Sequence, residues 1–218
     1  ALAYHDVMDC GWGRIARVRR RTHGGIIALS HTHRDSLVEA LPERTVYLIP
    51  QHHCNFLREA IPERPVLRVG AIGGDSAVQW PHHAVERMVN ALGLEWHYES
   101  HYHRRWRVVE FYKTIDIQLS FRPTHARSIP LHMNCLKLAN AGSFGIPTVA
   151  FPEPAYTTEW KDECLWGEGM EVIMWQIKRL KEDTGLYKEM ASRARMKAEE
   201  YHVEHIADLY RALPGGTA

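Results

Sequence analysis

Short apolar runs alternate with amphipathic helical patterns over the first fifty residues. Apolar, β-branched runs that predict strands cover residues 2–9, 25–30 and 45–50. Between them, residues 13–22 set Ile15 and Val18 on one face among arginines, and residues 34–41 form a second helical pattern that Pro42 ends. Strands that alternate with helices in this way are typical of a parallel sheet with covering helices. This part of the chain therefore predicts a βαβαβ unit.

The same alternation returns after a proline-containing stretch at 55–65, where we place a boundary between two lobes. Strands are expected at 65–74, 94–100, 115–121 and 147–151, and helices at 82–92, 106–114 and 131–143. From residue 169 to residue 213 the pattern is helical, with apolar stripes at Ile173, Ile177 and Leu180 and at Ile206, Leu209 and Tyr210, and with a break at Gly185. The fold class is α/β, with Rossmann-like parallel sheets, doubly wound in the second half.

Composition and charge narrow the class of protein. Of 218 residues, 45% are hydrophobic and 24% are charged, which is ordinary for a soluble globular chain. The net charge of +1 gives no global field that would favour nucleic acid or an anionic membrane. The four cysteines lack metal-finger spacing, so we expect reduced structural thiols. No signal-peptide pattern and no run of about 20 apolar residues is present. We expect a cytoplasmic protein, and leave peripheral membrane contact open.

Two loops carry the candidate binding residues, because ligands of doubly wound sheets bind beyond the carboxyl ends of the strands. The first loop, residues 70–81, is rich in glycine, and Gly73 and Gly74 would let backbone N–H groups approach a phosphate closely. It matches neither the G-x-G-x-x-G pattern nor a Walker P-loop. A turn of this kind also occurs without any ligand, so the loop alone leaves both interpretations open.

The second loop, residues 120–134, leads into a helix and carries more polar chemistry. Its candidates for contact with a donor are Arg122, Arg127, Asn134, Lys137 and Asn140. Lys137 lies about one helical turn from both asparagines, so the three can share a face. A cation and two amides near a helix N-terminus would suit a diphosphate. The alternative is a solvated loop followed by a polar helix stripe.

A stretch in the second half resembles a known family. The run YKTIDIQLSF, a loop, and then LKLANAGSFGIPTVAF resemble the C-terminal nucleotide-sugar-binding domain of GT-B glycosyltransferases, most specifically in its Gly-Ile-Pro-Thr-Val end. The run PVLRVGAIGG resembles that domain's first strand and loop. The resemblance implies a GT-B-like arrangement with a partial or minimal N-terminal Rossmann-like lobe at 1–60, a nucleotide-sugar-binding domain at 61–195 and a C-terminal helix crossing back to the first lobe at 196–218.

The sequence also departs from this family. Many retaining members carry two glutamates eight residues apart around this helix, and His132 and Asn140 stand at those positions here. The first half offers only part of a Rossmann domain. A minimal enzyme, a shortened chain and a degenerate homologue all remain open at this point.

The resemblance implies a metal-independent hexosyltransferase that needs no cofactor. Its donor would be a UDP- or GDP-sugar, and its acceptor a glycan or a lipid-linked sugar. Lys137, with Arg122 or Arg127, would stabilise the leaving diphosphate. An inverting reaction would also need a base on the acceptor side, for which the candidates are Asp9, His31 and His33.

Two other function classes stay in view. The first is a non-catalytic binding or assembly module with a nucleotide-sugar-like fold. The second is a metal-binding protein, since the chain has 15 histidines and pairs such as His31 and His33 could supply half of a metal site. Because the pairs lack matched carboxylates and no HExxH occurs, we expect no metal site. The basic runs at 14–21 and 103–107 are expected to be solvated helix faces, so we expect no nucleic-acid partner.

Overall fold

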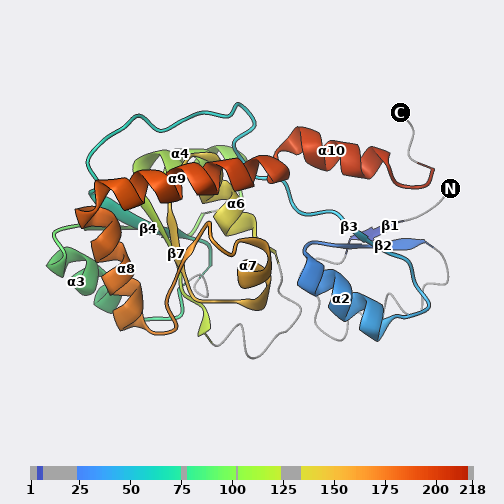
Figure 1. Ribbon diagram of the computed structural model, residues 1–218, viewed down its shortest axis with the longest axis horizontal. Helices are drawn as coiled ribbons and strands as arrows, with labels where there is room; N and C mark the ends of the chain where they lie inside the picture. Colours follow the sequence, from blue (N-terminus) through green and yellow to red (C-terminus); the bar gives the residue numbers. More distant parts are fainter. Residues whose placement is uncertain (1–3, 7–23, 75–77, 102, 124–133, 216–218) are drawn as a thin grey trace.

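The computed structural model describes residues 4–6, 24–74, 78–101, 103–123 and 134–215. They form two lobes, each built on a parallel sheet (Figure 1). The smaller lobe has the strand order β1-β2-β3, with β1 at Tyr4–Asp6, β2 at Gly25–Ala28 and β3 at Val46–Leu48. The larger lobe has the order β5-β4-β6-β7-β8, with β4 at Arg68–Ile72, β5 at Glu95–Glu99, β6 at Ile117–Ser120, β7 at Thr148–Ala150 and β8 at Leu165–Trp166.

Helices connect the strands and cover the sheets, which confirms the predicted α/β class. They are α2 (His31–Ala40), α3 (His82–Ala91), α4 (Arg105–Thr114), α6 (Leu136–Ser143), α7 (Pro154–Glu159), α8 (Met170–Glu182), α9 (Thr184–Ala198), the 3₁₀ turn η2 (Glu199–Tyr201) and α10 (Val203–Arg211). The short elements α7 and β8 were not predicted. The helix expected at 13–22 lies outside the described residues.

Local capping chemistry sets two helix starts that the apolar pattern placed differently. α2 begins three residues before the predicted helix because the Ser30 hydroxyl accepts from the backbone N–H of His33 at 3.1 Å. The break in the C-terminal helices falls at Asp183, not at Gly185. The Asp183 carboxylate accepts from the backbone N–H of Leu186 at 2.9 Å and so starts α9, with Gly185 inside its first turn.

The larger lobe has its core on both faces of the sheet. One face packs against α3, α8 and α9 through residues such as Val69, Leu119 and Ile177, all fully buried. The other face packs against α4 and α6. α6 also lies very close to α9, since a side chain added at Gly142 would meet the carbonyl oxygen of Ala194 at 2.6 Å. The small residues of α6 therefore serve helix–helix contact.

Two segments cross between the lobes side by side. After η2 the chain leaves the larger lobe, and α10 packs Ile206, with Leu213 beyond it, against Ile27 and Ile49 of the smaller lobe (Figure 1). The other crossing runs from the end of β3 toward β4, and the backbone N–H of His53 donates to the carbonyl of Tyr201 at 2.9 Å. The two crossings are thus tied to each other where they pass.

Candidate functional site

A buried ion pair lies just beyond the carboxyl ends of β6 and β7. Arg122 follows β6 and Glu153 follows β7. The guanidinium donates from Nε to Glu153 Oε1 at 2.8 Å and from Nη2 to Glu153 Oε2 at 2.6 Å, and Nη2 also donates to Tyr156 Oη at 2.8 Å. The two charged side chains are only 14% and 3% exposed. This two-pronged geometry fixes the guanidinium in one orientation.

Lys137 brings a second cation to the same place. It is the second residue of α6, and its side chain is close enough to Arg122 and Glu153 for both to influence its charge. Burial first, and then the charge of Arg122, lower the pKa of Lys137 to about 7, while Glu153 opposes this change. Within the described part of the chain, its ammonium forms no hydrogen bond. Arg122 and Lys137 therefore both lie beside the Glu153 carboxylate at this edge of the sheet.

The two asparagines predicted to join Lys137 have structural contacts. Asn140 is 7% exposed, and its Oδ1 accepts from the backbone N–H of Cys54 in the crossing segment at 2.7 Å. Asn134 Oδ1 accepts from the backbone N–H of Leu136 at 3.3 Å, at the start of α6. These bonds position α6, and contact of either amide with a donor stays a prediction.

The glycine loop after β4 is tied to the neighbouring strand. Gly73 has a φ of 137°, which favours glycine. Its N–H donates to the carbonyl of Glu99 at 3.0 Å, and its carbonyl accepts from Tyr98 Oη at 2.8 Å. Both backbone groups of Gly73 are therefore occupied. Gly74 is only partly buried, so it is the glycine of this pair whose contact with a phosphate stays a prediction.

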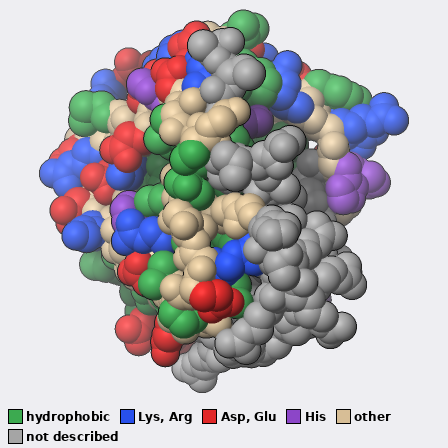
Figure 2. All heavy atoms as spheres, turned by 90° about the vertical axis from the view of Figure 1, so that its right-hand side faces the viewer, with side chains coloured by type: hydrophobic (Ala, Val, Ile, Leu, Met, Phe, Trp, Pro, Cys, Tyr) green, Lys and Arg blue, Asp and Glu red, His purple; other side chains and the backbone are tan. Residues whose placement is uncertain are grey.

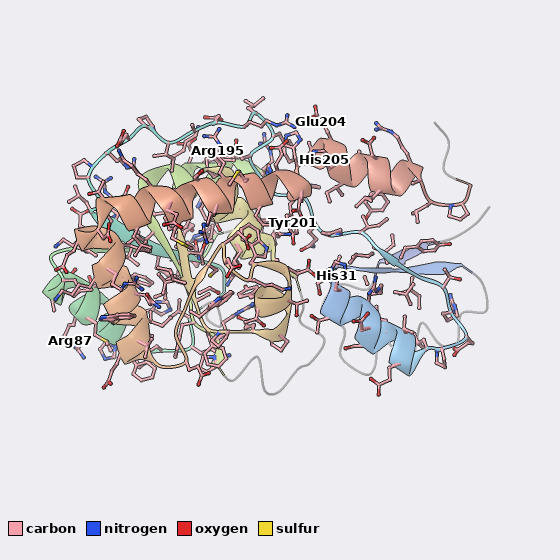
Figure 3. The ribbon with its side chains drawn as sticks, viewed as in Figure 1. His31, Arg87, Arg195, Tyr201, Glu204 and His205 are labelled. Carbon is pink, nitrogen blue, oxygen red and sulfur yellow. The ribbon has the colours of Figure 1, made fainter. Side chains whose placement is uncertain are left out.

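His31 lies where the lobes meet (Figure 3). The backbone N–H and Nδ1 of His31 lie 2.7 and 2.8 Å from Oε1 of Glu159, the last residue of α7. His33 is 1% exposed, and its Nδ1 accepts from the backbone N–H of Leu29 at 3.2 Å. Of these two candidate bases, only His31 can reach an acceptor between the lobes. Asp9, the third candidate, and Arg127 lie outside the described residues.

A cavity of about 260 Å³ lies between the lobes. Its walls come from the ends of β2 and β3, from α10 and from Leu136, which directly precedes Lys137. A larger cavity, of about 1000 Å³, lies at the opposite end of the sheet, beside Asp116 at the start of β6. There Asp116 is already paired with Arg64 at 2.6 Å. We place the candidate site in the interlobe crevice, because ligands of parallel sheets bind at the carboxyl ends of the strands.

Three residues of the site were missed in the sequence: Glu153, Tyr156 and Glu159. The phrase Phe151-Pro152-Glu153-Pro154 was a usable signal, since it sets a carboxylate directly after an apolar strand. Tyr156 and Glu159 gave no signal, because they lie on the unpredicted α7.

The described thiols are buried, and Arg105 of the basic run 103–107 has partners within the protein. Burial raises the pKa of the Cys54 thiol to about 12 and those of Cys135 and Cys164 well above their ordinary value. In the run 103–107, Arg105 donates to the carbonyl of Cys54 at 3.0 Å and covers the ring of Phe56. Figure 2 shows basic and acidic side chains interspersed over the described part of one face.

The residues that the structure describes hold neither a metal-binding group nor a membrane-spanning helix. No group of three or more histidine, cysteine, aspartate or glutamate side chains there is arranged to hold a metal ion. Among the same residues, no helix combines the length and the apolar character needed to cross a membrane.

Sequence comparison finds no matching family model and no curated protein of similar sequence. Solved structures do match. Anabaena HepE in complex with UDP-glucose has a TM-score of 0.67 and 13% identity, over 97% of this chain and 72% of that one. TarM has a TM-score of 0.64 and 13% identity, over 95% of this chain and 49% of that one. Sucrose-phosphate synthase from Thermosynechococcus elongatus has a TM-score of 0.63 and 12% identity, over 94% of this chain and 62% of that one. The chain thus spans about half the length of TarM. The similar structures are GT-B glycosyltransferases, and this chain has the GT-B fold.

Proposed function

We propose that the protein transfers a sugar from a nucleotide-sugar donor to an acceptor, with the donor diphosphate bound beyond β6 and β7. The observation that carries this proposal is the surplus positive charge formed by Arg122, Lys137 and Glu153. Burying a cation is costly, and an anionic ligand would offset that cost. A diphosphate supplies the missing negative charge.

Each side chain of this cluster would have its own role in binding the diphosphate. Glu153 and Tyr156 hold the Arg122 guanidinium in place, so it can meet phosphate oxygens without reorganising. Lys137 would take up a proton as the diphosphate binds and then oppose the negative charge that develops on the leaving group. Because Lys137 is in the first turn of α6, the helix dipole adds to the same field. Side chains and helix dipole supply this positive charge, so the proposed mechanism is metal-independent.

On the acceptor side, we propose His31 as the base if the reaction inverts stereochemistry. Glu159 lies 2.8 Å from His31 Nδ1, which leaves Nε2 to accept a proton from the acceptor hydroxyl. A carboxylate at Nδ1 fixes both the ring orientation and the tautomer in which Nε2 is unprotonated. The acceptor proposed is a glycan or a lipid-linked sugar.

The donor proposed first is a UDP-sugar, because similar structures are those of HepE in complex with UDP-glucose and with UDP. The test is titration calorimetry with UDP, UDP-glucose and GDP-mannose on the wild type and on Lys137→Met, which removes the charge and keeps most of the side-chain length. Lys178→Met is the matched control, since Lys178 is 53% exposed on α8 and pairs only weakly with Glu182 at 3.8 Å.

We expect one nucleotide to bind the wild type and Lys178→Met equally, and Lys137→Met at least about tenfold more weakly. Binding of no nucleotide, or equal binding by Lys137→Met, would contradict the proposed site. Release of free sugar from the donor in the presence of wild-type protein, and its loss in Lys137→Met, would support an enzyme. Tight binding without release or transfer would favour the non-catalytic module.

A further inference from the structure

A hollow of about 580 Å³ lies at the outer edge of the larger sheet, between β5 and α4. His97 and Glu99 of β5 line it together with Trp106, Arg107, Glu110 and Thr114 of α4. β5 is an edge strand and is separated from β7 by β4 and β6. The hollow therefore shares no residue with the candidate site in the interlobe crevice.

Its rim offers backbone groups for hydrogen bonding. The N–H of Glu95 donates to Leu67, and the carbonyl of Glu99 accepts from Gly73, so these residues direct their backbone groups toward the neighbouring β4 side. Backbone groups alternate in direction along a strand. Trp96 therefore directs its N–H and C=O groups outward from the sheet edge, where it also lines the hollow.

One wall of the hollow is an exposed aromatic ring. The side chain of Trp106 is 55% exposed, and the guanidinium of Arg107 lies 5.2 Å from the centre of its ring. A pyranose ring presents a face of C–H groups with partial positive charge, and the face of an indole ring is negative. An exposed tryptophan inside a hollow is therefore suited to stacking against a sugar ring.

The charges that line the hollow are mixed and nearly balanced. Glu99 and Glu110 are acidic, Arg107 is basic and His97 lies between them on β5. An anionic ligand would meet the two carboxylates, and a cationic ligand would meet the guanidinium. Neutral hydroxyl groups can donate to carboxylates and accept from a guanidinium, so they suit both kinds of group.

We propose that this hollow binds a neutral oligosaccharide, with one sugar ring stacked on Trp106 and its hydroxyl groups bonded to Glu99, Glu110 and Arg107. The volume lies within the range of small-molecule sites. This site goes beyond the proposed transfer reaction and does not depend on it. If the chain acts on a glycan, a second binding site would raise the local concentration of the acceptor.

The test measures binding of maltohexaose, cellohexaose, laminarihexaose and mannohexaose by NMR line broadening and tryptophan fluorescence. Trp106→Ala removes the proposed platform, and Trp106→Phe restores an aromatic face. Trp175→Ala is a closely matched control, because Trp175 is also 55% exposed and also has an arginine, Arg179, at 4.8 Å from its ring, but it lies on α8 outside the hollow.

We expect at least one neutral hexasaccharide to bind with a Kd on the order of 1 mM, and Trp106→Ala to weaken it at least about tenfold. Trp175→Ala should bind like the wild type, Trp106→Phe should lie between, and saturating UDP should not compete. The proposal is overturned if none of the four glycans binds, if Trp106→Ala binds as well as the wild type, or if dextran sulfate binds at this site better than every neutral glycan. Competition by UDP would place the glycan in the crevice and also overturn it.

Discussion

Two clusters of ionisable groups lie near α6, and they differ in how their members are paired. In the carboxyl-end cluster, Arg122 and Lys137 lie beside Glu153, and the Lys137 ammonium forms no hydrogen bond within the described part of the chain. In the crossing cluster, the ring centres of His53 and His202 lie 5.3 Å apart with their planes tilted by 59°, and each ring bonds to backbone groups. A charged group that lacks a hydrogen-bonding partner is suited to a ligand, whereas rings that bond to the backbone hold the two crossing segments together.

The ring nitrogens of the crossing cluster bond to backbone groups. His53 Nδ1 accepts from the backbone N–H of Asn55 at 3.2 Å, and His202 Nδ1 accepts from that of Glu204 at 3.4 Å. His202 Nε2 lies 3.2 Å from the carbonyl oxygen of Phe56. Burial, followed by the charge of His202, lowers the pKa of His53 to about 4.

The largest expected effect comes from breaking the ion pair of the carboxyl-end cluster. Arg122→Met removes the guanidinium that donates to both oxygens of the buried Glu153 carboxylate, which should lower the free energy of unfolding by about 3–5 kcal/mol. Arg211→Met is the control, since Arg211 is 62% exposed and its bond to Asp208 should contribute little. Urea denaturation of both variants measures the difference. Equal losses of unfolding free energy in the two variants would mean that burial does not make the Arg122 ion pair more important for stability than the Arg211 ion pair.

The next effect is a dependence of stability on pH that originates in the crossing cluster. The pKa of His53 is about 4 in the folded protein and about 6.5 when unfolded, so the unfolded chain binds more protons between these values. The contribution of His53 to the free energy of unfolding is complete above pH 6.5 and is lost as the pH falls toward 4. The full loss is about 3 kcal/mol.

Denaturation of the wild type and of His53→Gln at pH 7.5, 6, 5 and 4 measures this contribution. The difference in unfolding free energy between the two proteins should shrink as the pH falls. His205→Gln, at a residue that is 57% exposed, should keep the wild-type dependence. A pH-independent difference between wild type and His53→Gln would show that His53 titrates normally.

Asn140 binds the crossing segment next to His53 and lies about one helical turn from Lys137, so its substitution can separate a structural role from a binding role. Asn140→Ala leaves the buried backbone N–H of Cys54 without its acceptor, which should cost about 1–3 kcal/mol of stability. Because its Oδ1 is occupied by Cys54, the affinity of the folded variant for a nucleotide should stay near that of the wild type. Thermal unfolding and calorimetry on one sample measure both. A large loss of affinity for the nucleotide with unchanged stability would instead support a role of Asn140 in binding the donor.

The smallest expected effect concerns the charge of Lys137. Its pKa of about 7 means that binding a diphosphate requires a proton at higher pH. UDP-glucose has no phosphate group that titrates near neutrality, so its Kd should rise about tenfold between pH 6 and pH 8 as Lys137 loses its proton. The dependence should vanish in Lys137→Met. The same dependence of Kd on pH in the variant would show that a group other than Lys137 takes up the proton.

Most of the described strands and helices could be predicted from the sequence, but α7 and β8 could not. The patterns around Val69, Leu119 and Ile177 revealed elements with buried faces, and the structure has them. α7 and β8 have only six and two residues, too few to show a period. Lys137 and Arg122 were predicted as ligand contacts because cations beyond strand ends suit a ligand in this fold, whereas Glu153, which orients Arg122, was not considered.

The sequence by itself determined most of the order of strands and helices along the chain, because this order depends on spacing along a few neighbouring residues. Only the tertiary structure decided which polar groups meet. Arg122 and Glu153 are 31 residues apart, Cys54 and Asn140 are 86 apart, and His31 and Glu159 are 128 apart. Each of these contacts forms only when strand ends or lobes are brought together by burial of apolar surface elsewhere, and no local pattern encodes that distance.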